Sequence, residues 1–316
     1  MNQKEFGKKT LIIKPTSVCN FNCTFCSAKL LNIPLHEYVP EKLKQFLKEY
    51  KPSDVIITGG EPLVNPKTYF LDLINCLEQN GTDYNLSLTS NLTLWYKDPE
   101  KFEYLFTNPH VGVVTSFQYG EDRRENSVFT EDEFVKIFNK FYEMYNEKLM
   151  FIYIVNENNE TEVLKAGELA KKLGTTFKLN QQMPLGLSKS FYPRYKLIKL
   201  YLDIIKNGYG DQLESLDAFY NGKCPYPKSY KHCLYNKVVY VNNSGELIEH
   251  HCEDIISSKD EINIQKDVLF EKCLTCKMFH LCNSCSLNVF YSKQYKNEQC
   301  KWMKENYNDL SKYGLI

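Results

Sequence analysis

Three cysteines near the start of the chain have a spacing that suits metal chemistry. Cys19, Cys23 and Cys26 stand in the pattern CxxxCxxC. Thiolates bind zinc and iron-sulfur clusters, and three of them are one short of the four that an ordinary electron-transfer cluster uses. A 4Fe-4S cluster bound here would therefore have one iron open to another molecule. A three-cysteine zinc knuckle and three unrelated buried thiols are the alternatives.

A second group of cysteines lies near the other end of the chain. Its eight members are Cys224, Cys233, Cys252, Cys273, Cys276, Cys282, Cys285 and Cys300. Two CxxC pairs within this group each let two thiolates reach one metal from a single turn. Four thiolates serve zinc or an iron-sulfur cluster, so the spacing predicts a metal without naming it. The remaining cysteine, Cys76, lies in an apolar run and is interpreted as a small buried hydrophobe.

Several segments rich in glycine and polar residues are further candidates for a binding site. The segment Thr58-Gly59-Gly60-Glu61-Pro62 combines two glycines, which permit close backbone approach, with a carboxylate, which suits an ammonium partner. An ordinary strand-to-helix turn would also explain it. Weaker candidates of the same kind are Thr89-Ser90-Asn91, Ser116 to Gln118, Ile152 to Asn156 and Gln181-Gln182-Met183-Pro184-Leu185-Gly186.

The periodicity of the chain indicates which elements position these residues. From residue 11 to about 205, short apolar runs alternate with longer amphipathic runs, a pattern typical of strand-helix units around a parallel sheet. The expected strands are Leu11–Lys14, Val55–Thr58, Asn85–Thr89, Val111–Phe117, Met150–Val155 and Thr176–Asn180. The expected helices are Pro40–Tyr50, Lys67–Gln79, Pro99–Phe106, Thr130–Tyr145 and Thr161–Leu173. This predicts an α/β fold, a partial (β/α)6 TIM-like barrel, with its chemistry at the carboxyl ends of the strands.

The chain beyond about residue 210 has a different character. It contains the eight cysteines and one expected hairpin, in which Lys237–Val241 and Glu246–Glu249 are joined across Asn242-Asn243-Ser244-Gly245. We expect a barrel domain over residues 1–210 and a cysteine-rich extension over 211–316. The extension lacks the apolar content for a core of its own, so metal ligation is expected to supply its folding free energy.

The composition restricts the class of partner. Lys plus Arg and Asp plus Glu both count 39, so the formal net charge is zero and favours neither nucleic acid nor an acidic membrane. No run approaches the roughly 20 apolar residues that span a bilayer, and the polar start of the chain is unlike a signal segment. A cytoplasmic protein is expected, and in a reducing compartment clustered thiols favour metal over disulfides.

The CxxxCxxC motif and the Gly59-Gly60-Glu61-Pro62 (GGEP) segment together resemble the radical S-adenosylmethionine (SAM) superfamily. Its members carry CxxxCxxC after the first strand and GGEP after the second. The resemblance implies that Cys19, Cys23 and Cys26 hold a 4Fe-4S cluster, and that SAM binds its open iron. An electron from the cluster then cleaves SAM to methionine and a 5'-deoxyadenosyl radical. The residues implied to contact SAM are Phe25, Gly59, Gly60, Glu61, Pro62, Ser90, Asn91, Ser116, Gln118 and Asn156, with the loop 181–186 closing on the nucleoside.

The order of the eight later cysteines resembles the SPASM extension of this superfamily, and Gly245 before Cys252 fits the same pattern. The resemblance implies two auxiliary 4Fe-4S clusters. Their implied ligands are Cys224, Cys233, Cys252 and Cys285 for the first, and Cys273, Cys276, Cys282 and Cys300 for the second. Two spacings differ from the usual pattern, since Cys282 to Cys285 is one residue tighter and Gly245 to Cys252 is two residues longer.

Because SPASM proteins mostly modify peptides or proteins, the expected activity is that of a ribosomal peptide maturase. The adenosyl radical would abstract hydrogen from a residue of a peptide substrate, and an electron donor such as flavodoxin or ferredoxin would reduce the cluster. Glu253 or Asp254, directly after Cys252, would serve as general base, unless both are solvated acids. About ten residues precede the first strand, so leader recognition is expected to use a separate protein or the barrel face. The alternatives are a formylglycine-forming sulfatase maturase and a zinc-stabilised, non-catalytic binding protein.

Overall fold

The computed structural model describes residues 10–81, 83–120, 122–124, 127–182, 184, 190–214, 238–245, 276–282 and 293–316. The predicted ligands Cys224, Cys233, Cys252, Cys273 and Cys285 and the predicted bases Glu253 and Asp254 lie outside these residues. The chain forms two compact units: the first comprises Met1–Ile152, Pro184–Lys189 and Lys237–Ile248, and the second Tyr153–Met183, Ser190–Asn236 and Glu249–Ile316. The domain boundary expected near residue 210 stays a prediction.

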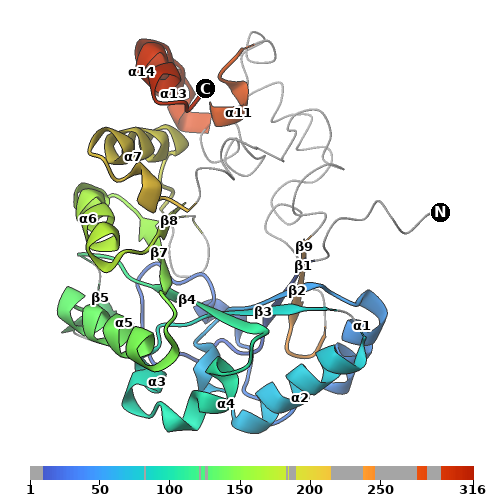
Figure 1. Cartoon of the computed structure of the whole chain (residues 1–316). Helices are drawn as coiled ribbons and strands as arrows, with labels where there is room; N and C mark the ends of the chain where they lie inside the picture. Colours follow the sequence, from blue (N-terminus) through green and yellow to red (C-terminus); the bar gives the residue numbers. More distant parts are fainter. Residues whose placement is uncertain are drawn as a thin grey trace. The chain divides into compact units, whose positions relative to one another are not determined.

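A seven-stranded sheet forms the centre of the fold, with the spatial order β8-β7-β4-β3-β2-β1-β9 (Figure 1). Its strands are β1 (Thr10–Lys14), β2 (Asp54–Ile57), β3 (Asn85–Thr89), β4 (Val111–Ser116), β7 (Met150–Val155), β8 (Phe177–Gln181) and β9 (Val238–Asn242). Pairing from β9 through β1, β2, β3 and β4 to β7 is parallel. The predicted α/β partial barrel is confirmed, and its six expected strands all form.

Side chains alternate between the two faces of these strands, as the two-residue repeat of a strand requires. In β1, Leu11 and Ile13 are fully buried, whereas Ile12 between them is partly exposed. In the first unit the buried face meets α1 (Glu41–Tyr50), α2 (Lys67–Gln79), α3 (Thr93–Lys97), α4 (Glu103–Phe106) and α5 (Glu131–Tyr145) (Figure 1). Parallel pairing places the carboxyl ends of β1 to β4 at one edge of the sheet, where the predicted site residues follow.

The helices differ from expectation in one place. The stretch expected as a single helix over Pro99–Phe106 is a 3-10 turn, Glu100–Phe102, followed by the short α4. The features not expected from the sequence include helix α3, a hairpin of β5 (Asp122–Arg124) with β6 (Ser127–Val128), and the helices after residue 190.

The hairpin expected before Cys252 is described only in its first arm and its turn. Its first arm is β9, which pairs in parallel with β1 and thus adds a strand to the sheet. The second arm lies outside the described residues. Gly245 ends the turn after β9 with a φ of +79°, and a Cβ there would lie 2.5 Å from the backbone nitrogen of Leu43 in α1. Only glycine therefore permits this turn to pack against α1.

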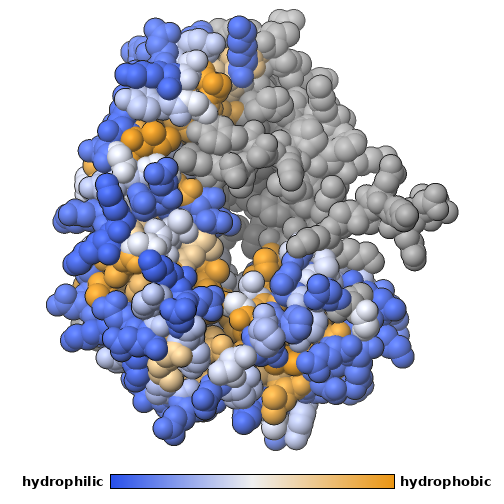
Figure 2. All heavy atoms as spheres, viewed as in Figure 1, coloured by the Kyte–Doolittle hydropathy of each residue, from blue (hydrophilic) through white to orange (hydrophobic). Residues whose placement is uncertain are grey.

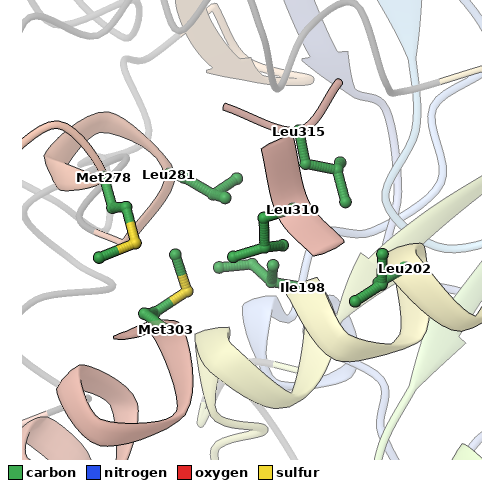
Figure 3. Close-up of a cluster of buried hydrophobic side chains, with 7 residues drawn as sticks. All are labelled: Ile198, Leu202, Met278, Leu281, Met303, Leu310 and Leu315. Atoms are coloured by element: carbon green, nitrogen blue, oxygen red, sulfur yellow. The ribbon is translucent and has the colours of Figure 1, made fainter. Parts of the chain in front are cut away.

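The second unit contains a hydrophobic cluster that includes the end of the chain. The helices are α6 (Val163–Leu173), α7 (Arg194–Lys206), α11 (Phe279–Cys282), α13 (Lys296–Glu305) and α14 (Tyr307–Lys312). Figure 3 shows the cluster side chains pointing toward one another: Ile198, Leu202, Met278, Leu281, Met303, Leu310 and Leu315. The C-terminal helices thus share a hydrophobic core with α7.

The described surface is mostly polar in the view of Figure 2, with scattered apolar side chains. No helix among the described residues is long and apolar enough to cross a membrane.

Candidate active site

The loop after β1 brings the three cysteines of CxxxCxxC into one region. The amide of Cys26 donates to the carbonyl of Cys23 at 3.2 Å, and the amide of Phe21 donates to Cys19 Sγ at 3.3 Å. Cys19 is exposed as a residue, yet desolvation of its thiol raises the pKa to about 12, with added repulsion from Glu61, Cys23 and Cys26. The thiols therefore lie close enough to influence one another, and a bound cation would be needed to deprotonate Cys19 near neutral pH.

The two glycines after β2 let the cysteine loop pack directly on the backbone. The amide of Gly60 donates to Thr16 O at 2.8 Å, and that of Glu61 donates to Val18 O at 2.9 Å. A Cβ on Gly60 would lie 2.2 Å from Val18 O. Gly59 has a φ of +116°, which other residues rarely adopt. The glycines thus join the GGEP segment to the loop that carries Cys19.

Glu61 places a buried carboxylate beside this loop. It is 2% exposed, and its Oε1 accepts hydrogen bonds from Ser90 Oγ at 2.6 Å and from the Leu63 amide at 3.1 Å. Its Oε2 accepts from the Asn91 amide at 2.8 Å. Burial raises the pKa of Glu61, and the three donors and the charge of Arg123 oppose this without cancelling it. A carboxylate has about four acceptor positions, so one remains on Oε2.

Arg123 is a site residue that the sequence did not reveal. It lies in β5, is 4% exposed, and donates to the carbonyl and hydroxyl oxygens of Ser116 at 2.6 and 2.7 Å. Its guanidinium lies 5.0 Å from the ring of Phe21, and its carbonyl accepts from the Asn22 amide at 2.8 Å. The cation therefore touches the cysteine loop and the end of β4. The only signal in the sequence is an arginine pair in the loop after the fourth strand.

Two buried donors of this region are left without an acceptor. Within the part of the chain that the structure describes, neither Arg123 Nε nor Gln118 Nε2 has a hydrogen-bond partner, and Gln118 is 1% exposed. Unpartnered buried donors are costly, so such groups commonly mark a ligand position. The arrangement suits a ligand that presents oxygen acceptors to these donors and an ammonium group to Glu61.

A comparison with protein families identifies the superfamily of the chain. Residues 13–170, half of the 316 residues, match the model of the radical SAM superfamily. The chain belongs to this superfamily. No curated protein sequence matches it.

Solved structures extend the likeness of this radical SAM protein over nearly its whole length. The structure of anSMEcpe with bound AdoMet has a TM-score of 0.65 and 16% identity, over 96% of this chain and 98% of that chain. The structure of anSMEcpe with bound AdoMet and Cp18Cys peptide has a TM-score of 0.65 and 17% identity, over 97% and 99%. Streptococcus suis SuiB bound to precursor peptide SuiA has a TM-score of 0.57 and 14% identity, over 90% and 73%. The fold is shared, in agreement with the resemblance to SPASM-type maturases.

The remaining predicted cofactor contacts of this radical SAM protein are distributed over both units. Phe25 is half-buried in the cysteine loop, and Pro62 is buried at the start of the 3-10 turn Pro62–Val64. Asn156, in the second unit, follows β7, and its Oδ1 accepts from the amides of Asn158 and Asn159 at 2.9 and 3.2 Å. Of the loop 181–186, the amide of Gln182 donates to Val155 O at 2.9 Å. Asn156 thus uses its side-chain oxygen within a turn.

Three of the eight later cysteines, Cys276, Cys282 and Cys300, lie in the described part of the second unit and are partly buried. The segment that carries two of them is held by its neighbours, since Gln299 Nε2 donates to Cys282 O at 2.9 Å and Arg194 Nε donates to Leu281 O at 3.4 Å. The described residues contain no group of three or more His, Cys, Asp or Glu arranged for a metal ion. The other predicted ligands lie outside these residues.

Proposed function

We propose that this radical SAM protein modifies a peptide, as a ribosomal peptide maturase, by abstracting a hydrogen atom from one of its residues. The observation that carries the proposal is the contact between the cysteine loop and the GGEP segment, where Glu61 lies buried beside the thiols. Support for a peptide substrate comes from two proteins of the same fold, solved with Cp18Cys peptide and with precursor peptide SuiA.

The thiols fit an iron-sulfur cluster in their chemistry, although the described residues do not bring three of them into the arrangement of a metal site. Cys19, Cys23 and Cys26 would hold it, since they share one loop and lie within electrostatic reach of one another. When bound, the cluster and SAM supply the electron and the adenosyl radical that removes the hydrogen atom. Backbone bonds from Gly60 and Glu61 keep the loop against the end of β2. The chain's own contribution is therefore orientation.

The amino-acid part of SAM would bind between opposite charges. Glu61 Oε2 has one acceptor position for the ammonium, and Arg123 Nε has a free donor for the carboxylate. Gln118 Nε2 offers a second donor to a carboxylate or ribose oxygen. Ser116 accepts from the Arg123 guanidinium, so it would act by positioning Arg123.

The auxiliary sites complete the proposal. Cys276, Cys282 and Cys300 would ligate a cluster with Cys273, and the other four late cysteines a further one, as the SPASM resemblance implies. Either Glu253 or Asp254 would take the proton when the substrate radical is oxidised. The late cysteines would hold a group that supplies electron-acceptor chemistry when bound.

Formation of 5'-deoxyadenosine tests the proposal. After anaerobic reconstitution and reduction with dithionite, the wild type should cleave SAM and Cys23→Ala should not, because a ligand is lost. The matched control is Cys76→Ala, a partly buried cysteine on α2 outside the loop, which should retain cleavage. Equal product in wild type and Cys23→Ala would reject the radical mechanism.

Formylglycine formation is the second candidate, favoured by the nearly full mutual coverage with anSMEcpe, which was solved with Cp18Cys peptide. The same reduced protein would be given a short Cys- or Ser-containing sulfatase peptide. Conversion of that peptide would support this candidate over a ribosomal peptide maturase.

A further inference from the structure

Three side chains at the edge of the site form a closed ring of hydrogen bonds. Asn20 Nδ2 donates to Thr93 Oγ1 at 2.7 Å, Thr93 Oγ1 donates to Asn91 Oδ1 at 2.6 Å, and Asn91 Nδ2 donates to Asn20 Oδ1 at 2.9 Å. Each member donates to the next in the same direction around the ring. Hydrogen bonds arranged this way polarise and strengthen one another. Neither Asn20 nor Thr93 was expected to belong to the site.

The ring joins the cysteine loop to Glu61. Asn20 directly follows Cys19, whose Sγ lies 4.0 Å from Asn20 Oδ1. On the other side, the Asn91 amide donates to Glu61 Oε2, the oxygen that keeps a free acceptor position. A displacement of Glu61 would therefore be passed to the Asn91 amide, then from the Asn91 side chain to Asn20, which is next to Cys19.

The backbone beneath the ring is held in an uncommon conformation. Leu92, between Asn91 and Thr93, is fully buried and has a φ of +57°, which is unfavourable for a leucine. Its amide donates to Ser90 Oγ at 2.9 Å, and the Thr93 amide donates to Asn91 Oδ1 at 3.0 Å. Asn91 and Thr93 are 5% and 7% exposed. Two members of the ring thus lie on a buried segment whose backbone is fixed by its own hydrogen bonds.

We propose that Asn20 is a positioning residue that couples cofactor binding at Glu61 to the cysteine loop. The inference rests on the proposed function. The ring preorganises the loop before a cluster binds, and a ligand seated on Glu61 tightens the loop through Asn91 and Asn20. Asn20 would act through its bonds to Asn91 and Thr93 rather than on the reacting atoms.

The first test uses iron-free protein. Asn20→Ala should lower the temperature of thermal unfolding, because the bonds of the ring join protein side chains only. The matched control is Asn22→Ala, the same substitution two residues along the loop, where an exposed side chain accepts from Lys29 Nζ and takes no part in the ring. An Asn20→Ala protein that unfolds with the control and the wild type would refute preorganisation.

The second test measures coupling in cluster-loaded protein. The rate of iron loss to EDTA is measured with and without SAM, and the ratio of the two rates is compared between proteins. In the wild type SAM should slow iron loss, and in Asn20→Ala and Thr93→Val this protection should fall about three- to tenfold, as expected for one lost hydrogen bond. Thr93→Ser keeps the hydroxyl and should restore it, and Asn22→Ala should leave it unchanged.

The ratio separates positioning from a general loss of stability. A variant that only weakens the fold speeds iron loss equally with and without SAM, which leaves the ratio at the wild-type value. That result for Asn20→Ala would overturn the inference while the proposed function stands. A wild type that neither retains iron nor responds to SAM would reject the proposed function itself.

Discussion

Glu61 serves both the fold and the candidate site. It follows β2, yet its carboxylate binds Ser90 and Asn91, which follow β3, and so joins two neighbouring strand ends. Burial is the main reason why its pKa is raised, and hydrogen bonds from these residues limit the rise. A buried carboxylate is tolerated only where donors surround it. The position and orientation of this group are therefore set before any cofactor binds.

Replacing Glu61 should reduce stability as well as cofactor affinity. Glu61→Ala leaves Ser90 Oγ and two amides without their acceptor, so the free energy of unfolding of iron-free protein should fall by about 1–3 kcal/mol. Glu61→Gln should lose less, because its amide oxygen still accepts from Ser90 and Leu63. Calorimetry measures both. Titration of the reconstituted variants with SAM should show at least about tenfold weaker binding, through loss of the charge. Unchanged stability in Glu61→Ala would show that these hydrogen bonds make no net contribution to the free energy of unfolding.

Helices α7, α13 and α14 pack together, and α13 carries Cys300. Met303 in α13 and Leu310 in α14 are fully buried against Ile198 and Leu202 of α7 (Figure 3). Each such side chain contributes about 1.5–3 kcal/mol through burial. The expectation that metal holds the extension together therefore needs a qualification, because apolar packing already fixes these helices to one another.

Truncation of the cluster should destabilise iron-free protein. Leu310→Ala is expected to lower the free energy of unfolding by about 2–5 kcal/mol, the range for a buried leucine. Ile316→Ala provides the control, since Ile316 is a large apolar residue of the same C-terminal segment but is exposed. Chemical denaturation of both variants compares them. If Leu310→Ala behaves like the control, the helices depend on metal rather than on packing.

A tyrosine of α7 that donates a hydrogen bond to α13 should make the stability of these packed helices depend on pH in the alkaline range. Desolvation and a hydrogen bond to Glu298 Oε2 at 3.0 Å raise the pKa of Tyr195 to about 12, from 10.0. The folded state thus holds the phenolic proton more tightly, so its contribution is complete below pH 10.0 and is lost as pH rises toward about 12. Urea midpoints should fall over this interval, and less steeply in Tyr195→Phe. The same slope in both proteins would assign it to other groups.

The whole molecule combines a barrel that contains the superfamily motifs with a cysteine-rich end. The family model ends at residue 170, whereas the fold shared with anSMEcpe covers 96% of the chain. The likeness in fold therefore extends beyond the residues that the family model matches. The iron and zinc content of the protein tests whether the region of the eight late cysteines binds clusters.

Anaerobic reconstitution should load about twelve irons per chain, as three four-iron clusters require. Removing Cys19, Cys23 and Cys26 together should leave about eight, because the eight late cysteines are untouched. Iron and zinc are measured by elemental analysis of the same samples. Zinc together with only about four irons would refute the auxiliary clusters and leave the first site as the single cluster.

Local pattern was enough to predict the six expected strands, most of the helices between them and the two motifs of the superfamily. The alternation in Val111–Ser116 and the spacing of Cys19, Cys23 and Cys26 depend on neighbours in sequence alone. Tertiary structure decided which distant residues complete the site. Asn20 meets Thr93 and Cys23 meets Arg123 across many intervening residues, and these contacts arise only when parallel strands bring their carboxyl ends to one edge. The pairing of β9 with β1 was likewise decided by the tertiary structure, because the turn residues next to a strand cannot specify which distant sheet edge it joins.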